Sequence, residues 1–174
     1  MTTLATVITG ASSGIGEALA HLFAPEQQTL VLVARRKERL DALAKELNSK
    51  HGIKVHVIAQ DLQEIGAAAN LMNSIANLNL TVDTLVNNAG FGISAPFAKS
   101  DGAKTSAMMQ LNMVALTELT HMALPAMLER RHGRIMNIAS VVAFQACPYF
   151  AVYAATKAYV LSFTEALAAE VSDR

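Results

Sequence analysis

The sequence predicts an α/β fold, a doubly wound parallel sheet of the Rossmann type in three α/β/α layers. Short apolar runs that suit buried strands alternate with longer segments of helical period. A glycine-rich turn, residues 10–16, joins the first apolar run to the first helical segment. The composition is 52% hydrophobic and 16% charged, which suits a sheet that helices cover on both faces.

Each expected element follows from a local pattern. Runs rich in valine, leucine, isoleucine and threonine predict buried strands, and these runs cover residues 4–9, 29–34, 53–58, 85–88 and 133–138. Segments with apolar residues at helical spacing predict helices, and these cover residues 14–23, 37–50, 64–78, 103–130 and 152 to the C-terminus. Pro125 removes a backbone donor, so we expect a kink near the end of the long helix. Strict alternation implies parallel strands joined by right-handed crossovers.

The bulk composition excludes several classes of function. At 174 residues the chain is expected to form one domain over residues 1–174. Lys+Arg and Asp+Glu both number 14, which argues against a nucleic-acid partner or an acidic membrane. One cysteine, Cys147, allows no intramolecular disulfide, and the five histidines lack metal-ligand spacing, so no metal site is predicted. Without a basic leader or a bilayer-length apolar run, we expect a cytoplasmic protein.

The glycine-rich turn predicts a dinucleotide-binding loop. It reads Gly10-Ala11-Ser12-Ser13-Gly14-Ile15-Gly16, a GxxxGxG spacing directly after the first strand. Glycines permit a tight turn and let the backbone approach a pyrophosphate, while the helix that follows presents free N–H groups and the positive end of its dipole. The alternative is an ordinary glycine-rich turn, which the position after the first strand makes less favourable.

Two arginines at the end of the second strand favour NADP(H). An NAD-binding domain normally has an acid here, which holds the ribose 2′-hydroxyl. The chain has Arg35 and Arg36 instead, and guanidinium groups suit a 2′-phosphate through charged, bidentate hydrogen bonds. The alternative is that both arginines belong to the solvated charge run of residues 35–39.

Tyr153 and Lys157 form the strongest catalytic signal. Residues at i and i+4 share one helix face, so the ammonium can lie beside the phenol. An ordinary tyrosine holds its proton too tightly for work at neutral pH, and a neighbouring positive charge favours the phenolate. Tyr153 is therefore a candidate general acid/base. Ser140, before this helix, completes the pattern.

These motifs closely resemble the short-chain dehydrogenase/reductase family over essentially the whole chain. Gly10, Gly14 and Gly16 match its TGxxxGxG loop. The family's NNAG segment after the fourth strand is matched by Asn87, Asn88, Ala89 and Gly90. Its acidic position beside the adenine is matched by Asp61, with Leu62. Its catalytic positions are matched by Asn112, Ser140, Tyr153 and Lys157.

The resemblance implies hydride transfer between NADP(H) and a small carbonyl or alcohol substrate. Ser140 would hold the carbonyl oxygen and Tyr153 would donate the proton. Lys157 would favour the phenolate and bind the ribose hydroxyls of the nicotinamide. Asn112 would hold a water that links Lys157 to solvent. A homodimer or homotetramer through the long helix and the last helix is also expected.

The chain departs from the family in length. Family members usually continue with two more strands and a helical flap over the substrate, so we expect a domain that is incomplete at its C-terminus, with the fifth strand as an open edge. The alternative function is a truncated, non-catalytic dinucleotide-binding or interaction module.

Overall fold

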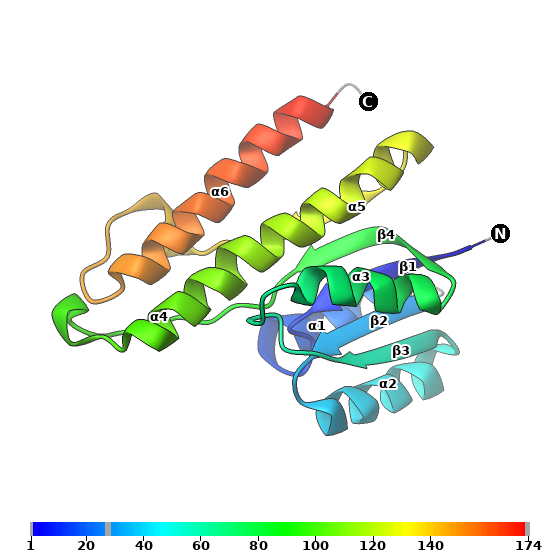
Figure 1. Ribbon diagram of the computed structural model, residues 1–174. Helices are drawn as coiled ribbons and strands as arrows, with labels where there is room; N and C mark the ends of the chain where they lie inside the picture. The colour runs from blue at the N-terminus through cyan, green and yellow to red at the C-terminus, as the bar shows by residue number, and fades with distance from the viewer. Residues whose placement is uncertain (1, 27–28, 173–174) are drawn as a thin grey trace.

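The computed structural model describes residues 2–26 and 29–172 (Figure 1). Its sheet has five parallel strands in the order β3-β2-β1-β4-β5, so the strand order reverses between β1 and β4. The strands are β1 (Thr3–Thr9), β2 (Thr29–Ala34), β3 (Lys54–Ala59), β4 (Leu80–Asn87) and β5 (Arg134–Asn137). The predicted parallel, doubly wound sheet is therefore confirmed, with β3 and β5 at its two edges.

Helices cover both faces of the sheet because alternate strand residues point to opposite sides. On one face, Val31 and Val33 of β2 pack with α3 and α5. On the other face, Leu30 and Leu32 pack with α1 and α2. The helices are α1 (Gly14–Phe23), α2 (Lys37–His51), α3 (Ala67–Asn77), α4 (Gly102–Met109), α5 (Leu116–Arg130) and α6 (Ala151–Val171).

The long helix contains a π-helical turn, which the sequence did not predict. A turn of π-helix at Gln110–Ala115 joins α4 to α5, so that the three segments form one rod. Helix α6 packs along α4 and this turn, and Figure 1 shows α6 running beside the rod. The helix continues through Pro125, and the kink expected there stays a prediction.

Other element boundaries differ from the sequence prediction for local reasons. Strand β4 begins at Leu80 instead of residue 85, because the polar residues Thr81 and Asp83 interrupt the apolar run although the strand continues through them. Thr81 pairs with Leu4, and Asp83 lies at a register shift between the pairs Ala5–Val82 and Thr6–Thr84. Helix α3 begins at Ala67 instead of residue 64, since Gly66 adopts a left-handed conformation with φ of 79° just before it. The remaining boundaries agree within one residue, except that α6 ends at Val171 and not at the C-terminus. Residues 173–174, which the prediction included in this helix, lie outside the described residues.

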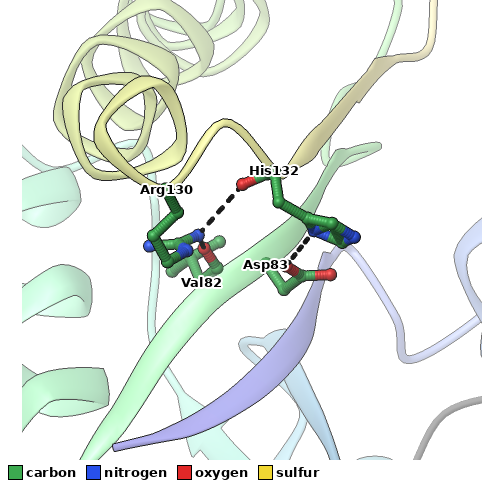
Figure 2. Close-up of polar contacts among 4 residues, drawn as sticks. All are labelled: Val82, Asp83, Arg130 and His132. Atoms are coloured by element: carbon green, nitrogen blue, oxygen red, sulfur yellow. Dashed lines mark hydrogen bonds and ion pairs between the residues drawn. The ribbon is translucent and has the colours of Figure 1, made fainter.

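Polar contacts of Arg130 and His132 with Val82 and Asp83, which we call the clasp, anchor the turn between α5 and β5 (Figure 2). Arg131 ends α5 in a left-handed conformation with φ of 51°. Nδ1 of His132 lies 3.0 Å from Oδ1 of Asp83, and Nη2 of Arg130 donates to the carbonyl oxygen of Val82 at 3.0 Å. Since Val82 and Asp83 belong to the first half of β4, the clasp lies at the opposite end of the sheet from the strands' carboxyl ends.

Among the residues that the structure describes, no helix has the length and apolar character needed to cross a membrane.

Candidate functional site

A cleft of about 380 Å³ opens at the carboxyl ends of the strands, where the strand order reverses. Ligands of open α/β sheets bind at this position. The cleft wall brings together most of the predicted cofactor residues from five separate parts of the chain. These residues are Gly10, Ser12, Ser13, Ile15, Arg35, Arg36, Asp61, Leu62, Asn88, Ala89, Gly90, Tyr153 and Lys157. Of the predicted set, Gly14 and Gly16 lie outside the described cleft wall.

The glycine loop owes its shape to close backbone contacts. Gly10 and Gly14 have φ of 68° and 60°, in the left-handed region that favours glycine. A Cβ added to Gly10 would lie 2.7 Å from Nδ2 of Asn88, and one added to Gly16 would collide with the carbonyl oxygen of Gly10. Gly16 therefore lets the first turn of α1 pack tightly on the end of β1, which keeps the amide groups of that turn near the cleft.

Thr9 is a structural residue of this loop that the sequence reasoning missed. Its hydroxyl accepts hydrogen bonds from the backbone N–H groups of Asn88 and Ala89, both at 3.0 Å, and donates to the carbonyl oxygen of Val86 at 3.1 Å. The side chain of Asn88 in turn donates to the carbonyl oxygen of Thr9 at 2.9 Å. The sequence signal that could have indicated this role is a threonine at the end of an apolar strand, directly before the glycine loop.

The two arginines occupy different places on the rim. Nη2 of Arg36 donates to the hydroxyls of Ser12 and Ser13 at 2.9 and 2.6 Å, so its guanidinium lies over the glycine loop. Nη1 of Arg35 lies 3.6 Å from Oδ2 of Asp61 across the cleft, and the Arg35 side chain is 66% exposed. The rim therefore carries positive charge at the end of β2, with Arg36 in the more fixed position.

Tyr153 and Lys157, on the first turns of α6, also line the cleft. Lys157 is only 6% exposed, and its Nζ donates to the carbonyl oxygen of Ile138 at 2.6 Å. Burial lowers the pKa of the Lys157 ammonium below its ordinary value. The ring of Tyr153 packs against Phe150, with ring centroids 6.0 Å apart.

Two of the predicted catalytic residues, Ser140 and Asn112, lie outside the described cleft wall. Ser140 directly follows Ala139, which lines the cleft, and its Oγ accepts a hydrogen bond from the N–H of Val142 at 3.4 Å, where it caps a short 3₁₀ turn. Asn112 is buried in the π-helical turn, 1% exposed, and its amide binds both backbone groups of Phe91.

A second polar network connects the sheet to both long helices. Nδ2 of Asn87 donates to Oγ1 of Thr120 at 3.0 Å and to Oδ1 of Asn137 at 2.9 Å. Nδ2 of Asn137 continues to Oγ1 of Thr164 on α6 at 2.9 Å. This network ties α5 and α6 to the ends of β4 and β5, and its members other than Asn87 carried no sequence signal.

Within the described residues, no three or more His, Cys, Asp or Glu side chains are grouped so that they could hold a metal ion.

Comparisons with known proteins agree with this fold. The family model described as short chain dehydrogenase matches residues 5–174. An 11-beta-hydroxysteroid dehydrogenase of Pinus massoniana is 40% identical over 166 residues, which are 95% of this chain and 46% of that protein. A dehydrogenase/reductase SDR family protein 7-like of Anopheles gambiae is 34% identical over 170 residues, 95% of this chain and 54% of that protein.

Among solved structures, a short-chain dehydrogenase from Sphingobium yanoikuyae in complex with NADPH superposes with a TM-score of 0.90 at 37% identity. The match covers 98% of this chain and 66% of that one. The chain spans about half the length of the curated relatives it matches.

Proposed function

This chain belongs to the short-chain dehydrogenase family, and from that premise we propose that its cleft binds NADP(H) and serves the interconversion of a carbonyl and an alcohol. One observation carries the proposal. The glycine loop and the Tyr153/Lys157 pair, far apart in the sequence, line a single cleft. A cofactor that reaches from the loop to α6 would bring its reactive end to the candidate acid/base.

The rim of the cleft supports a phosphorylated ribose. Arg36 already binds the hydroxyls of Ser12 and Ser13, so one guanidinium and two hydroxyls converge on one point above the loop. Such a set suits a 2′-phosphate, which accepts several charged hydrogen bonds. Arg35 adds a second positive charge. The NADPH in the Sphingobium yanoikuyae structure is in line with this assignment.

The other predicted cofactor residues can be assigned to parts of a cofactor that runs from the glycine loop toward α6. Gly14, Ile15 and Gly16 open α1, and their backbone, together with that of Gly10, would hold the pyrophosphate. Asp61 and Leu62 lie where the adenine would rest. Asn88, Ala89 and Gly90 would form the floor between the two ends of the cleft. When bound, the nicotinamide supplies or accepts the hydride.

The chain's own residues would handle the proton and the substrate oxygen. The hydroxyl of Tyr153 would give its proton to the carbonyl oxygen during reduction. The buried ammonium of Lys157 would favour the phenolate that remains and bind ribose hydroxyls. Ser140 would hold the substrate oxygen. Asn112 would hold a water next to Lys157 through which the proton is replaced.

We also propose that the protein assembles through α5 and α6 as a homodimer or homotetramer. Three apolar or aromatic residues along this surface remain 38%, 41% and 39% exposed: Val114 of the π-helical turn, Met122 of α5 and Tyr159 of α6. Tyr159 stacks on Phe163, with ring centroids 5.9 Å apart, and its hydroxyl lies 2.8 Å from Oγ1 of Thr117. These contacts make a rigid apolar surface that suits a two-fold interface. The cytoplasmic location and the division into one domain stay predictions.

One sample can separate an enzyme from a binding module. NADPH binding is measured by fluorescence titration, and NADPH consumption is then measured against a panel of small ketones and aldehydes. Saturable binding together with consumption that depends on the carbonyl supports the proposal. Binding without consumption favours the non-catalytic module, and absence of binding contradicts both.

A further inference from the structure

Thr156 joins the catalytic turn of α6 to the π-helical turn of the neighbouring rod. It stands between Tyr153 and Lys157 in the sequence and is 1% exposed. Its hydroxyl donates to the carbonyl oxygen of Tyr153 at 2.7 Å and accepts a hydrogen bond from Nδ2 of Asn112 at 3.1 Å. Because the one proton of this hydroxyl is donated to the backbone carbonyl of Tyr153, its oxygen can only accept a hydrogen bond from Asn112.

The Asn112 amide has the orientation that this restriction requires, and Phe91 favours the same orientation. With Nδ2 directed at Thr156, the same Nδ2 also donates to the carbonyl oxygen of Phe91 at 3.0 Å, and Oδ1 accepts from the N–H of Phe91 at 3.1 Å. A reversed amide would place its oxygen against the Phe91 carbonyl and its nitrogen against the Phe91 N–H. A single amide therefore holds both backbone groups of Phe91, and Thr156 accepts a further hydrogen bond from the same amide.

The loop that Asn112 holds lies against the ring of Tyr153. We call residues Gly90–Gly92 the strap. A Cβ added to Gly92 would lie 3.1 Å from Cγ and Cδ2 of Tyr153, and one added to Gly90 would lie 3.0 Å from Oδ1 of Asn112. A side chain at either end of the strap would therefore press on Asn112 or on the Tyr153 ring. Contacts form a closed path from Tyr153 through Thr156, Asn112 and the strap back to the Tyr153 ring.

We propose that Thr156 is a positioning residue, which holds Asn112 and the strap so that the Tyr153 phenol keeps a fixed direction in the cleft. The inference rests on the proposed function, in which Tyr153 transfers the proton. Proton transfer depends steeply on the placement of the donor, so a small displacement of the phenol lowers the rate of the chemical step. Cofactor binding is expected to change little, because the glycine loop and Arg36 would hold most of the cofactor.

The test compares Thr156→Val with Thr156→Ser. Valine keeps the shape of threonine but removes the hydroxyl, whereas serine keeps the hydroxyl. We expect Thr156→Val to lower kcat about tenfold with NADPH affinity within about twofold of wild type, and Thr156→Ser to stay within about twofold in both. A loss of general stability would lower activity and cofactor binding together.

A spectroscopic measurement reports on the phenol without any turnover. The chain has three tyrosines, so 3-fluorotyrosine labelling gives a simple fluorine NMR spectrum in which Tyr153→Phe identifies the Tyr153 signal. Thr156→Val should move that signal and Thr156→Ser should leave it in place. The inference is wrong if Thr156→Val keeps both the wild-type kcat and the wild-type signal, or if both variants change equally.

Gly92→Ala places a methyl group of the strap against the same ring. This variant tests the inference if Thr156→Val does not fold. The added methyl should displace the ring, so the Tyr153 signal should move and kcat should fall while NADPH affinity holds. Gly102→Ala is the matched control, because a Cβ there meets nothing within 4 Å. An unmoved signal in Gly92→Ala contradicts the inference. A wild-type protein that reduces no carbonyl contradicts the proposed function instead, and the fluorine spectra still test the strap.

Discussion

The ammonium of Lys157 donates a hydrogen bond of 2.6 Å to the carbonyl oxygen of Ile138, which connects α6 to the residue that follows β5. The bond directs a nearly buried cation toward the cleft in which Tyr153 also lies. Such a group reduces stability through its lost hydration and is retained where its charge has a function. This relationship leads to the first prediction.

Lys157 should make stability depend on alkaline pH. Burial lowers the pKa of its ammonium below the ordinary 10.5, so between the two values the unfolded chain binds more protons than the folded one. Stability contributed by this group therefore rises with pH in that window. In Lys157→Met the rise should be missing. The melting temperature of the variant relative to wild type should be highest near neutral pH and should decrease as pH approaches 10.5; a pH-independent difference would contradict this.

Arg36 should control the choice between the two cofactors. We expect wild type to bind NADPH at least about tenfold more tightly than NADH, a difference of about 1.4 kcal/mol. Arg36→Ala should remove most of that difference while NADH affinity stays unchanged, because Arg36 is held above the loop by Ser12 and Ser13. Arg35→Ala should have a smaller effect, since Arg35 is directed toward Asp61 and not toward the loop serines. Fluorescence titrations with both cofactors measure these affinities. Arg39→Ala is the control, because Arg39 is an exposed arginine of the same charge run.

Tyr153→Phe should stop turnover and leave cofactor binding nearly intact. The change removes the proposed proton donor but keeps the ring that packs against Phe150, so the loss should be confined to the chemical step. The control is Tyr159→Phe, which removes a hydroxyl from the same helix away from the cleft. If Tyr153→Phe retained more than about a tenth of the wild-type rate, another group would have to supply the proton.

Gly16→Ala should destabilise the fold as well as weaken cofactor binding. The new Cβ would collide with the Gly10 carbonyl oxygen in a closely packed place, and overpacking of this kind typically costs about 1–3 kcal/mol. Urea unfolding at equilibrium measures the loss. Gly102→Ala, at an open position, should change the unfolding free energy by less than about 0.5 kcal/mol. Equal stability of the two variants would show that the loop can relax around the methyl group.

Much of the fold could be predicted because its signals are local. Apolar runs and helical spacing gave the parallel sheet and its helices, and the glycine spacing indicated the cleft. The start of β4 was missed because Thr81 and Asp83 look like loop residues. The π-helical turn at Gln110–Ala115 was missed since a change of hydrogen-bond register leaves little trace in apolar periodicity.

The site was predictable as a set of residue types but not as a set of contacts. Tyr153, Lys157 and the glycines were visible because each carries chemistry or a backbone requirement at a characteristic spacing. Thr156 and Asn137 were not, since their partners are brought close only by the packing of α6 against the rod and the sheet. The places of Ser140, which caps a short turn, and of Arg36, which lies on the loop serines, likewise depend on the folded structure.

The most direct test of the central proposal follows a labelled hydrogen. Wild-type protein is mixed with NADPH carrying two deuterium atoms at C4 of the nicotinamide and with a panel of ketones and aldehydes, and the products are analysed by mass spectrometry. We expect at least one alcohol to carry one deuterium on its carbinol carbon, and Tyr153→Phe to yield none while still binding the cofactor. Saturable NADPH binding with no deuterated alcohol from any carbonyl would contradict hydride transfer and leave a binding module.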